Sequence, residues 1–360
     1  MVTSDTTALT IGAGDRVLVT GGAGFIGSSL VRELCHRGAR VTAMVEPGGD
    51  TDNLDGLDVE LVTADLRHAD AVAGAVADSR IVFHVAALYR FWAADPNDFY
   101  DINVTGTRNV LDAARRSGCE RVVYTSTVGT LGLHGATIRD PVDEDSFARV
   151  DHLFGGYKQS KYVAEHEVLR AGAAGLPVVL VQPTTPVGPR DRGPTPTGRT
   201  VLEFLNGRFP GFVDTTLNIV DVEDVAHGHV LAAEQGEIGR SYILGGENLL
   251  LRDVLGALAR ATGLPAPTRQ FPNGLALGAA HVFELVGRVL HREPLVPLEA
   301  AKMSTTHMSF DDRRARTELG YDSRPAAEAL GRAARWFVEA GFVRPERVAL
   351  FTWEDAAGCR

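Results

Sequence analysis

The sequence has few cysteines, and their arrangement excludes a disulfide or zinc scaffold. Cys35, Cys119 and Cys359 are the three cysteines of the 360-residue chain, and they are scattered, without a C-x-x-C pair. Disulfide frameworks and zinc knuckles need closely and regularly spaced cysteines, so this usage predicts a reducing compartment. The first residues include neither a basic segment nor a long apolar run, which argues against a signal peptide and favours a cytoplasmic protein.

Basic tracts and long apolar runs are also missing. No run of lysine or arginine exceeds a pair and the formal net charge is −10, so a nucleic-acid partner is not expected. The most apolar stretch, residues 273–291, is interrupted by His281, Glu284 and Arg288. It predicts an amphipathic helix that packs on the protein and no membrane span; docking on a membrane surface is the alternative.

Short apolar runs alternate with helical patterns in the first half of the chain. Runs that are apolar at nearly every position indicate strands covered on both faces. With helices predicted between them, as at 26–37 and 104–117, the pattern predicts an α/β fold with a doubly wound parallel sheet. The predicted strands are 16–20, 40–45, 59–64, 80–86, 121–126 and 177–183.

The amino-acid composition of the sequence changes after Pro183. Residues 183–198 are rich in proline, glycine and threonine and are predicted to form no regular element. Further on, helices are predicted at 201–206, 222–234 and 251–262, and a strand at 241–246. The expected division is a Rossmann-type domain at 15–185, a substrate-binding region at 186–343 whose strand returns to the sheet, and loose tails at 1–14 and 344–360.

A glycine-rich turn follows the first predicted strand. Gly21, Gly24 and Gly27 have the spacing G-x-x-G-x-x-G and precede a predicted helix. Glycines allow a tight turn and the close approach of a pyrophosphate, which the N–H groups of the helix N-terminus can bind. A plain glycine-rich turn is the alternative, but the strand-turn-helix context favours a dinucleotide.

Two acidic residues are candidates for the adenosine end of that dinucleotide. Glu46 ends the second predicted strand, where its carboxylate could accept hydrogen bonds from both ribose hydroxyls and repel a 2′-phosphate. This favours NAD over NADP; an exposed loop carboxylate is the alternative. Asp65 follows the third strand and is either an adenine contact or the N-cap of the next helix.

Tyr157 and Lys161 are four residues apart, so on a helix they share one face. An ammonium close to a phenol lowers the pKa of the phenol from about 10, and such a tyrosine can exchange a proton with a reacting hydroxyl. Lys158 points about 100° away around the helix and cannot share this role. Because the spacing is common by chance, an incidental surface pair is the alternative.

Hydroxyl side chains at the end of the fifth predicted strand strengthen the case for a catalytic site. Thr125, Ser126 and Thr127 stand there, and ligands of open α/β sheets bind at the carboxyl ends of the strands. A hydroxyl at this edge could hydrogen-bond a substrate carbonyl or alkoxide. Together with a nicotinamide cofactor, a tyrosine and a lysine, such a group is typical of hydride transfer.

The motifs "TGGAGFIG", "HVAA", "NVTGTRNVL", "YTSTVGTLG" and "YKQSK" resemble those of extended short-chain dehydrogenase/reductases, in the NAD-dependent epimerase/dehydratase group. The resemblance spans about residues 15–337 and is greatest to hopanoid-associated sugar epimerases and dihydroflavonol 4-reductases. It implies that Thr127 is the catalytic hydroxyl, that Tyr157 is the acid/base, and that Lys161 also binds the nicotinamide ribose. It also implies a homodimer formed through the helices at 104–117 and 157–170. Tyr157 is also expected to contact the cofactor, and the remaining expected cofactor contacts are Phe25, Ile26, Leu66, Ala86, Ala87, Thr125 and Pro183.

Several positions depart from the family pattern. Val128 and Gly129 stand where sugar-nucleotide 4,6-dehydratases carry an acidic pair, so no acid for an elimination follows the catalytic threonine. Thr185 replaces an asparagine of many sugar-nucleotide epimerases. Glu46 replaces an arginine found in similar NADP-binding proteins, and Asp221 replaces a histidine, with an effect on the substrate site that the sequence leaves open.

Aromatic residues after the fourth predicted strand are candidates for a substrate wall. Tyr89, Phe91 and Trp92 could contact a ring or hydrocarbon, with Arg90 as an anion anchor; aromatic packing between domains is the alternative. Thr185 is a further candidate for the substrate site.

Loop arginines and a pair of histidines are further candidates. Arg190 and Arg192 could bind a phosphate or carboxylate; solvated loop arginines are the alternative. His227 and His229 would face apart on a helix, so no metal site is expected.

The sequence thus predicts an NAD-dependent enzyme that moves hydride to or from a carbon bearing a secondary alcohol or ketone. The substrate is expected to be a small, ring-bearing molecule. An epimerase that retains its cofactor is one alternative, and a non-catalytic NAD-sensing protein with the same fold is another. The aromatic residues and the threonine at 185 favour a reductase or dehydrogenase.

Overall fold

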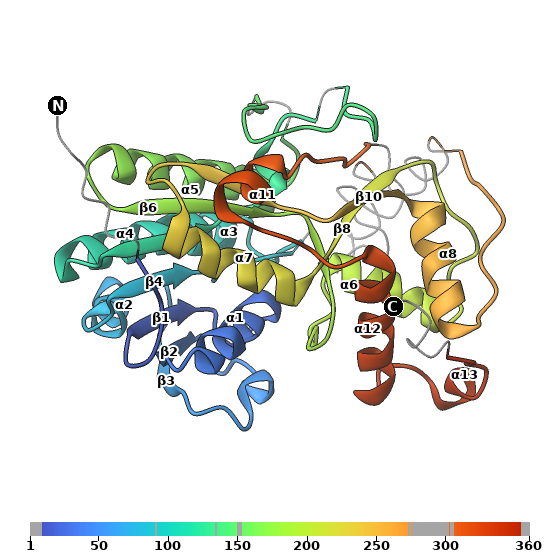
Figure 1. Ribbon diagram of the computed structural model, residues 1–360, viewed down its shortest axis with the longest axis horizontal. Helices are drawn as coiled ribbons and strands as arrows, with labels where there is room; N and C mark the ends of the chain where they lie inside the picture. Colours follow the sequence, from blue (N-terminus) through green and yellow to red (C-terminus); the bar gives the residue numbers. More distant parts are fainter. Residues whose placement is uncertain are drawn as a thin grey trace.

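The computed structural model describes residues 9–353 apart from 91, 134, 150–152, 273, 275–301 and 303–305. Two β-sheets organise the chain, one of seven strands and one of three (Figure 1). Phe91 and, apart from Gly274, the amphipathic helix predicted at 273–291 lie outside the described residues.

The large sheet is parallel throughout, in the order β3-β2-β1-β4-β5-β6-β9. This order confirms the predicted doubly wound α/β fold. Because the connections run outward from β1 to β3 and then return to β4, the carboxyl edge between β1 and β4 is the switch point where such sheets bind ligands. The strands are β1 (Arg16–Thr20), β2 (Arg40–Val45), β3 (Glu60–Thr63), β4 (Ile81–His84), β5 (Arg121–Thr125), β6 (Val178–Pro183) and β9 (Ser241–Leu244).

Helices cover both faces of the large sheet. Val17 and Val19 of β1 pack toward one layer and Leu18 toward the other, so successive strand residues serve two separate apolar cores. Coverage on both faces explains why the strands read as continuous apolar runs. One layer holds α1 (Phe25–His36), α7 (Val222–Gln235) and α11 (Arg313–Leu319), and the other holds α2 (Ala69–Val76), α4 (Gly106–Ser117) and α5 (Gly156–Ala173).

A smaller body lies at one end of the large sheet (Figure 1). Its three-stranded sheet and its helices share a third apolar core, in which Phe204, Leu258 and Phe337 are buried. The strands, in the order β10-β8-β7, are β7 (Thr185–Val187), β8 (Thr216–Asp221) and β10 (Glu247–Leu250). The helices are α6 (Pro196–Leu205), α8 (Leu251–Thr262), α12 (Ala326–Glu339) and α13 (Pro345–Val348).

The prediction that residues 183–198 form no regular element was wrong at both ends of the segment. β7 lies within it, and its Pro186 is tolerated because β7 is an edge strand of the small sheet. α6 begins at Pro196, a residue suited to the first helical position, and Thr195 caps the helix by accepting the N–H of Gly198.

The folded chain extends past both predicted tail boundaries. Ile11 is buried, and its N–H donates to Glu234 of α7 at 2.9 Å. At the other end, α13 follows α12, and Phe351 and Trp353 pack against the core of the small body. Ile11 and the segment from α13 to Trp353 are therefore packed on the rest of the protein.

Carboxylates and arginines join the two bodies at the start of α7. Asp221 is fully buried at the end of β8, and it caps α7 by accepting the N–H of Glu223 at 2.8 Å. Arg332 of α12 donates to Asp221 Oδ2 at 2.7 Å, and Arg324 pairs with Asp224 at 2.7 Å. Burial raises the pKa of Asp221 to about 7, although the charge of Arg324 opposes the shift. Asp221, whose role the sequence left open, is thus a helix cap and an ion-pair partner.

Replacing Arg332 by methionine should destabilise the protein, and more strongly at high pH. Removing one partner of a buried ion pair costs about 3–5 kcal/mol. The cost should be smaller here, because Arg324 remains 3.6 Å from the same oxygen of Asp221. A buried aspartate with a raised pKa is least costly when it is protonated. The loss in the free energy of unfolding of Arg332→Met should therefore be larger at pH 8 than at pH 5.

Urea unfolding at the two pH values measures this difference. Arg252→Met, at an exposed arginine of α8, is the control and should change stability by less than about 0.5 kcal/mol. An equal loss for Arg332→Met at both pH values would contradict the assignment to Asp221.

Candidate active site

The glycine-rich turn joins β1 to α1 at the switch point of the large sheet. A Cβ on Gly27 would lie 2.1 Å from the carbonyl oxygen of Gly21, so a larger residue would force the turn to move. Gly21 has a φ of +65°, and a Cβ there would lie 2.9 Å from the Cα of Ala86, beyond β4. Within the described part of the chain no side chain caps α1, so the N–H groups of Phe25 and Ile26 are available to an anion.

The two acidic candidates follow neighbouring strands. Glu46 directly follows β2 and is exposed, and its carbonyl accepts the N–H of Gly49 in a turn. Asp65 follows β3, and its carboxylate is bound by the guanidinium of Arg67 at 2.7 Å, which lowers the pKa of Asp65. The alternative in which Asp65 caps the next helix is wrong, because His68 takes the N-cap position of α2.

Thr185 places a buried hydroxyl beside the end of the sheet. Its Oγ1 has no hydrogen-bond partner among the described residues. It begins β7 two residues after Pro183, where β6 ends. Since buried hydroxyls are normally hydrogen-bonded, Thr185 stays a candidate for a hydrogen bond to a ligand. Ala86 and Ala87, beyond β4, are partly exposed, whereas Leu66, beyond β3, is buried.

Lys161 is buried on α5 together with Tyr157, one helical turn before it. The ammonium donates to the carbonyl of Thr125 at 2.7 Å and lies 4.3 Å from the ring centre of Tyr124. Burial lowers the pKa of Lys161 to about 7, against the opposing charge of Glu165. Lys161, the lysine that the helix geometry selects, is therefore bound to the last residue of β5.

Lys158, the other lysine of this segment, takes a different direction. Its side chain lies beside Gly129, within 3.4 Å of where a Cβ would stand. It is partly exposed. The structure thus separates the two lysines as the helix geometry predicted, and Lys161 donates to the carbonyl of Thr125 at the strand end.

The hydroxyl of Thr125 is bound within the protein. Its Oγ1 lies 2.9 Å from Nε2 of His229, and Nδ1 of the same ring lies 2.7 Å from the carbonyl of Val225. Nδ1 must carry the proton that this carbonyl accepts, so Thr125 donates to Nε2. Burial lowers the pKa of His229 to about 4, which keeps the ring neutral at physiological pH. Sequence reasoning did not identify His229 as a partner of the site, because the two residues are 104 positions apart.

Thr127 differs from its two neighbours in exposure. Ser126 is buried and donates to Glu165. Thr127 is partly exposed, and its Oγ1 accepts the N–H of Gly129 at 3.1 Å, which leaves the hydroxyl proton for another acceptor. The exposure and the hydrogen bonding therefore agree with the expectation that Thr127 is the hydroxyl that meets a substrate.

Asn103 connects the aromatic loop to α5 and was not among the predicted site residues. It lies in a π-helical segment, Asp101–Thr105, and such segments are frequent at functional sites. Its Oδ1 accepts the N–H of Leu88 at 2.7 Å, and its Nδ2 donates to Ser160 at 2.9 Å. Ser160 in turn donates to the carbonyl of Tyr157 at 2.9 Å. The motif around Asn103 is visible in the sequence, but the π-helical turn has no spacing signal of its own.

The aromatic loop brings one predicted substrate residue to the tyrosine. The ring of Tyr89 lies 4.8 Å from that of Tyr157, at an angle of 52°, and Tyr89 is 43% exposed. Trp92 is half-buried and Arg90 is exposed. Tyr89 is therefore an aromatic candidate whose ring contacts Tyr157 directly.

The loop arginines are paired with carboxylates of the protein. Arg190 binds Glu223 at 2.8 Å, in the cluster at the start of α7. Arg192 binds Asp50 at 3.0 Å and also pairs with Asp52. Both guanidinium groups therefore have carboxylate partners within the protein, whereas the alternative expected from the sequence was solvated loop arginines.

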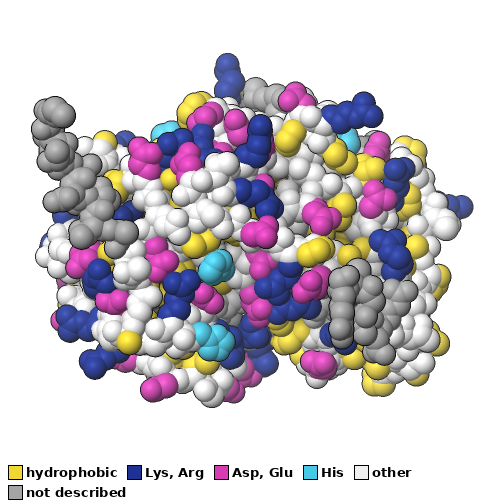
Figure 2. All heavy atoms as spheres, in the orientation of Figure 1, with side chains coloured by type: hydrophobic (Ala, Val, Ile, Leu, Met, Phe, Trp, Pro, Cys, Tyr) yellow, Lys and Arg dark blue, Asp and Glu magenta, His cyan; other side chains and the backbone are white. Residues whose placement is uncertain are grey.

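The histidines of α7 face different elements, as predicted. His227 lies 3.2 Å from Glu33 of α1, whereas His229 binds Thr125. Within the described residues no group of three or more metal-ligating side chains comes together. None of the helices described is both long and apolar enough to cross a membrane. Figure 2 shows acidic and basic side chains interspersed over the visible face.

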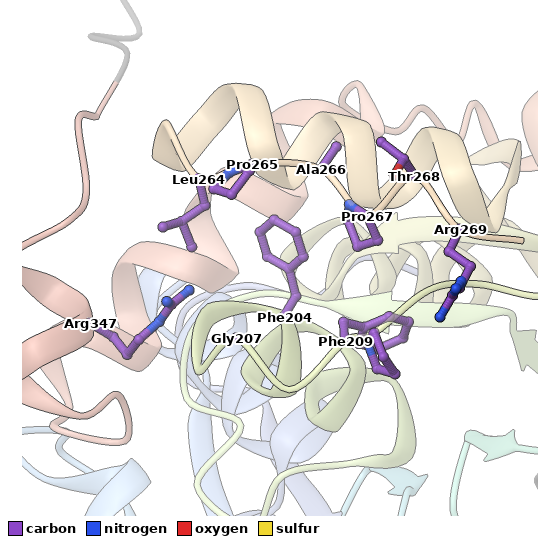
Figure 3. A pocket seen from close by; sticks show the side chains of 11 residues that line it. Phe204, Gly207, Phe209, Leu264, Pro265, Ala266, Pro267, Thr268, Arg269 and Arg347 are labelled. Atoms are coloured by element: carbon purple, nitrogen blue, oxygen red, sulfur yellow. The ribbon is translucent and has the colours of Figure 1, made fainter.

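A cavity of about 360 Å³ lies in the small body (Figure 3). Phe204, Phe209 and Leu264 form part of its apolar wall, and Arg269 and Arg347 contribute charge. None of the predicted site residues lines it. The candidate chemistry therefore belongs to the carboxyl edge of the large sheet rather than to this cavity.

Comparison with known families and proteins agrees with this site. A family model described as the NAD dependent epimerase/dehydratase family matches residues 17–245. The chain is 43% identical over 340 residues to a putative dihydroflavonol 4-reductase of Synechocystis sp., covering 93% of this chain and 98% of the relative. It is 33% identical over 330 residues to sterol demethylase protein B of Methylococcus capsulatus, covering 91% and 99% of the two chains.

Solved structures with the same fold include the crystal structure of gox2253. That structure is 42% identical, with a TM-score of 0.82, and the match covers 92% of this chain and 100% of that one. The UDP-glucose 4-epimerase of Thermus thermophilus, solved in complex with NAD, is 25% identical with a TM-score of 0.69, covering 90% and 99%.

Replacing Lys161 by methionine should stabilise the protein in the absence of a nucleotide. Burying an ammonium costs free energy, which is why the pKa of Lys161 is lowered from 10.5 to about 7. The cost is largest below pH 7 and disappears as the pH rises toward 10.5, where lysine is neutral in both the folded and unfolded chain. The gain in thermal midpoint should therefore be larger near pH 7 than near pH 9.5.

Thermal unfolding of the nucleotide-free protein at these pH values measures the gain. Lys158→Met is the matched control, because Lys158 is partly exposed on the same helix, and its effect should not depend on pH. A gain for Lys161→Met that stays constant from pH 7 to 9.5 would contradict the burial cost.

Proposed function

This chain belongs to the NAD-dependent epimerase/dehydratase family, and on that basis we propose that it is an NAD-dependent reductase or dehydrogenase. Its substrate would be a small, ring-bearing molecule with a secondary alcohol or ketone. The family and the relatives are enzymes of the extended short-chain dehydrogenase/reductase type, and so is this protein. The observation that carries the proposal is the buried ammonium of Lys161, which shares a face of α5 with the buried Tyr157 and donates to the carbonyl of Thr125 at the carboxyl end of β5.

The residues at the switch point fit NAD. Gly21 and Gly27 shape a turn without side chains, and the start of α1 offers free N–H groups for the pyrophosphate. Glu46 would accept hydrogen bonds from the adenosine ribose, and Asp65 would contact the adenine while bound to Arg67. When bound, the nicotinamide supplies or accepts the hydride.

The catalytic side chains have distinct roles in the proposed reaction. Tyr157 gives a proton to the substrate oxygen in reduction and removes it in oxidation. Thr127, with its free hydroxyl proton, donates a hydrogen bond to the same oxygen. Lys161 stabilises the phenolate form of Tyr157 by its charge, and the family resemblance adds a contact with the nicotinamide ribose. Because Lys161 is buried, water screens this charge little.

Several observations favour net redox chemistry over epimerisation. Tyr89 presents an exposed aromatic ring against Tyr157, which suits an apolar ring better than a sugar nucleotide. Thr185 stands where many sugar-nucleotide epimerases carry an asparagine. A reductase and a sterol-processing protein are among the similar proteins. The alternative, an epimerase that retains its cofactor, is supported by the likeness to UDP-glucose 4-epimerase.

Release of the cofactor separates the two functions. A reductase must exchange its cofactor at every turnover, whereas an epimerase returns the hydride to its own substrate. The purified protein would be denatured and the supernatant assayed for NAD, and ketones and alcohols would be screened for a change in nicotinamide absorbance. Net turnover supports the reductase; tightly retained NAD without net turnover supports the epimerase.

Replacing Tyr157 by phenylalanine should lower kcat about 10²- to 10⁴-fold, the contribution typical of general acid–base catalysis. The thermal midpoint should change little, because the phenyl ring keeps its packing against Tyr89. Tyr162→Phe is the matched control, at a tyrosine of the same helix whose ring contacts His166. Full biological activity of Tyr157→Phe would instead favour a non-catalytic NAD-sensing protein.

Replacing Glu46 by arginine should shift cofactor preference toward NADP. The change removes a carboxylate that would repel a 2′-phosphate and adds a cation that can bind it, so the ratio of kcat/KM for NADPH to NADH should rise about 10- to 100-fold. Glu60→Arg makes the same charge change at the amino end of β3, on the opposite edge of the sheet, and should leave the ratio unchanged. An unchanged ratio of kcat/KM in Glu46→Arg would contradict the proposed contact between Glu46 and the adenosine ribose.

Two further properties remain predictions from the sequence. One is a homodimer formed through the helices at 104–117 and 157–170, and the other is a cytoplasmic location. Sedimentation of the purified protein measures the first.

A further inference from the structure

Glu165 lies one helical turn beyond Lys161 on α5. Its Oε2 accepts a hydrogen bond from the hydroxyl of Ser126, at the end of β5. The same oxygen lies 3.0 Å from Oγ1 of Thr130 and 3.4 Å from Nε2 of Gln182 of β6. One carboxylate oxygen therefore gathers donors from β5, from the turn after it and from β6.

Two of these donors flank Thr127, the proposed catalytic hydroxyl. Ser126 precedes it, and Thr130 closes the short 3₁₀ turn that follows. The hydroxyl of Thr130 has a single proton and lies between Glu165 and the carbonyl of Thr127, 2.8 Å from the latter. The N–H of Thr130 donates to the same carbonyl at 3.1 Å. Glu165 thus fixes the backbone on both sides of Thr127.

The same carboxylate opposes the cost of burying Lys161. Among the residues that the structure describes, Tyr124 and His84 are titratable groups near this ammonium, and Tyr157 precedes it by one turn of α5. Burial raises the pKa of Tyr124 well above 10 and lowers that of His84 to about 3, so neither of these two carries a charge that compensates Lys161 near neutral pH. Glu165 is the group whose charge raises the pKa of Lys161 against desolvation.

One further titratable group approaches from the opposite helix layer. His229 of α7 binds the hydroxyl of Thr125, the residue whose carbonyl holds Lys161. Burial lowers the pKa of His229 to about 4, so the ring stays neutral over the range in which Lys161 titrates.

We propose that Glu165 is a positioning residue that fixes the strand end carrying Thr127 and supplies the negative charge that favours the ammonium of Lys161. Its catalytic consequence rests on the proposed function, whereas the contacts and the charge are present without any substrate. Two substitutions separate the contributions: Glu165→Gln keeps an acceptor oxygen and removes the charge, and Glu165→Asp keeps the charge and shortens the reach to Ser126.

A titration of Lys161 tests the charge without relying on enzyme activity. The chain has three lysines, Lys158, Lys161 and Lys302, so lysine labelled with ¹³C at Cε gives few NMR signals, and single Lys→Arg variants assign them. In the nucleotide-free protein the Lys161 signal should titrate near pH 7. Glu165→Gln should lower this midpoint by about one pH unit, and Glu165→Asp should largely restore it.

Glu167→Gln is the matched control for this titration. Glu167 lies two residues further along α5, on its surface, and pairs with Arg108 at 2.7 Å. The control removes the same charge from the same helix and should leave the Lys161 midpoint unchanged. An unchanged midpoint in Glu165→Gln, or an equal shift in Glu167→Gln, would overturn the proposed electrostatic role.

The pH dependence of kcat/KM tests the catalytic consequence. If the reaction needs the ammonium of Lys161, kcat/KM falls as the pH rises through the pKa of that group. Glu165→Gln should move this high-pH limb of the profile to lower pH, by the same amount as it lowers the Lys161 midpoint measured by NMR. Glu165→Asp should leave the limb in place and lower kcat about 10- to 100-fold, because Ser126 and Thr130 lose their acceptor. Wild-type kcat in Glu165→Asp would overturn the positioning role.

The two measurements distinguish failure of this inference from failure of the proposed function. If Glu165→Gln lowers the Lys161 midpoint but the wild type turns over no alcohol or ketone, the proposal of a reductase is rejected and the role of Glu165 is kept. Turnover by the wild type, with neither the NMR midpoint nor the kinetic limb moved in Glu165→Gln, would reject the role of Glu165 and keep the reductase.

Discussion

The arrangement of the site depends on one ammonium buried at the carboxyl edge of a parallel sheet. A cation in the interior is costly unless polar groups are fixed around it. Lys161 has the carbonyl of Thr125 at 2.7 Å and the ring of Tyr124 at 4.3 Å. Thr125 is held by His229 from the helix layer on the other face, while Glu165 supplies an opposing charge from α5. Both helix layers therefore meet at this single side chain.

The same burial links stability to chemistry. An exposed lysine would be screened by water, whereas a buried one acts on Tyr157 through a low dielectric. In the proposed function, the buried charge of Lys161 therefore acts strongly on Tyr157, in keeping with the perturbed groups found at functional sites. Near this centre Thr127 is partly exposed and Tyr89 is exposed, so the proposed substrate would meet a hydroxyl and an aromatic ring.

Much of the fold could be predicted from the sequence, because local patterns carry it. Apolar runs located the strands of the large sheet, and the glycine spacing located the turn between β1 and α1. The segment after Pro183 was misread, since its composition favours loops while edge pairing and a helix N-terminus accept Pro186 and Pro196. Asn103 and Glu165 were missed because their partners come from other elements, at distances along the chain that no motif spacing records.

The sequence by itself determined which residues could share a surface: Tyr157 and Lys161 on one helical face, with Lys158 turned away. Only the tertiary structure decided which polar groups were still available for chemistry. It bound Arg190 to Glu223 and the hydroxyl of Thr125 to His229, and it left Thr127 partly exposed. Spacing along a helix is fixed by the backbone, whereas the partner of a long polar side chain depends on which distant elements pack beside it.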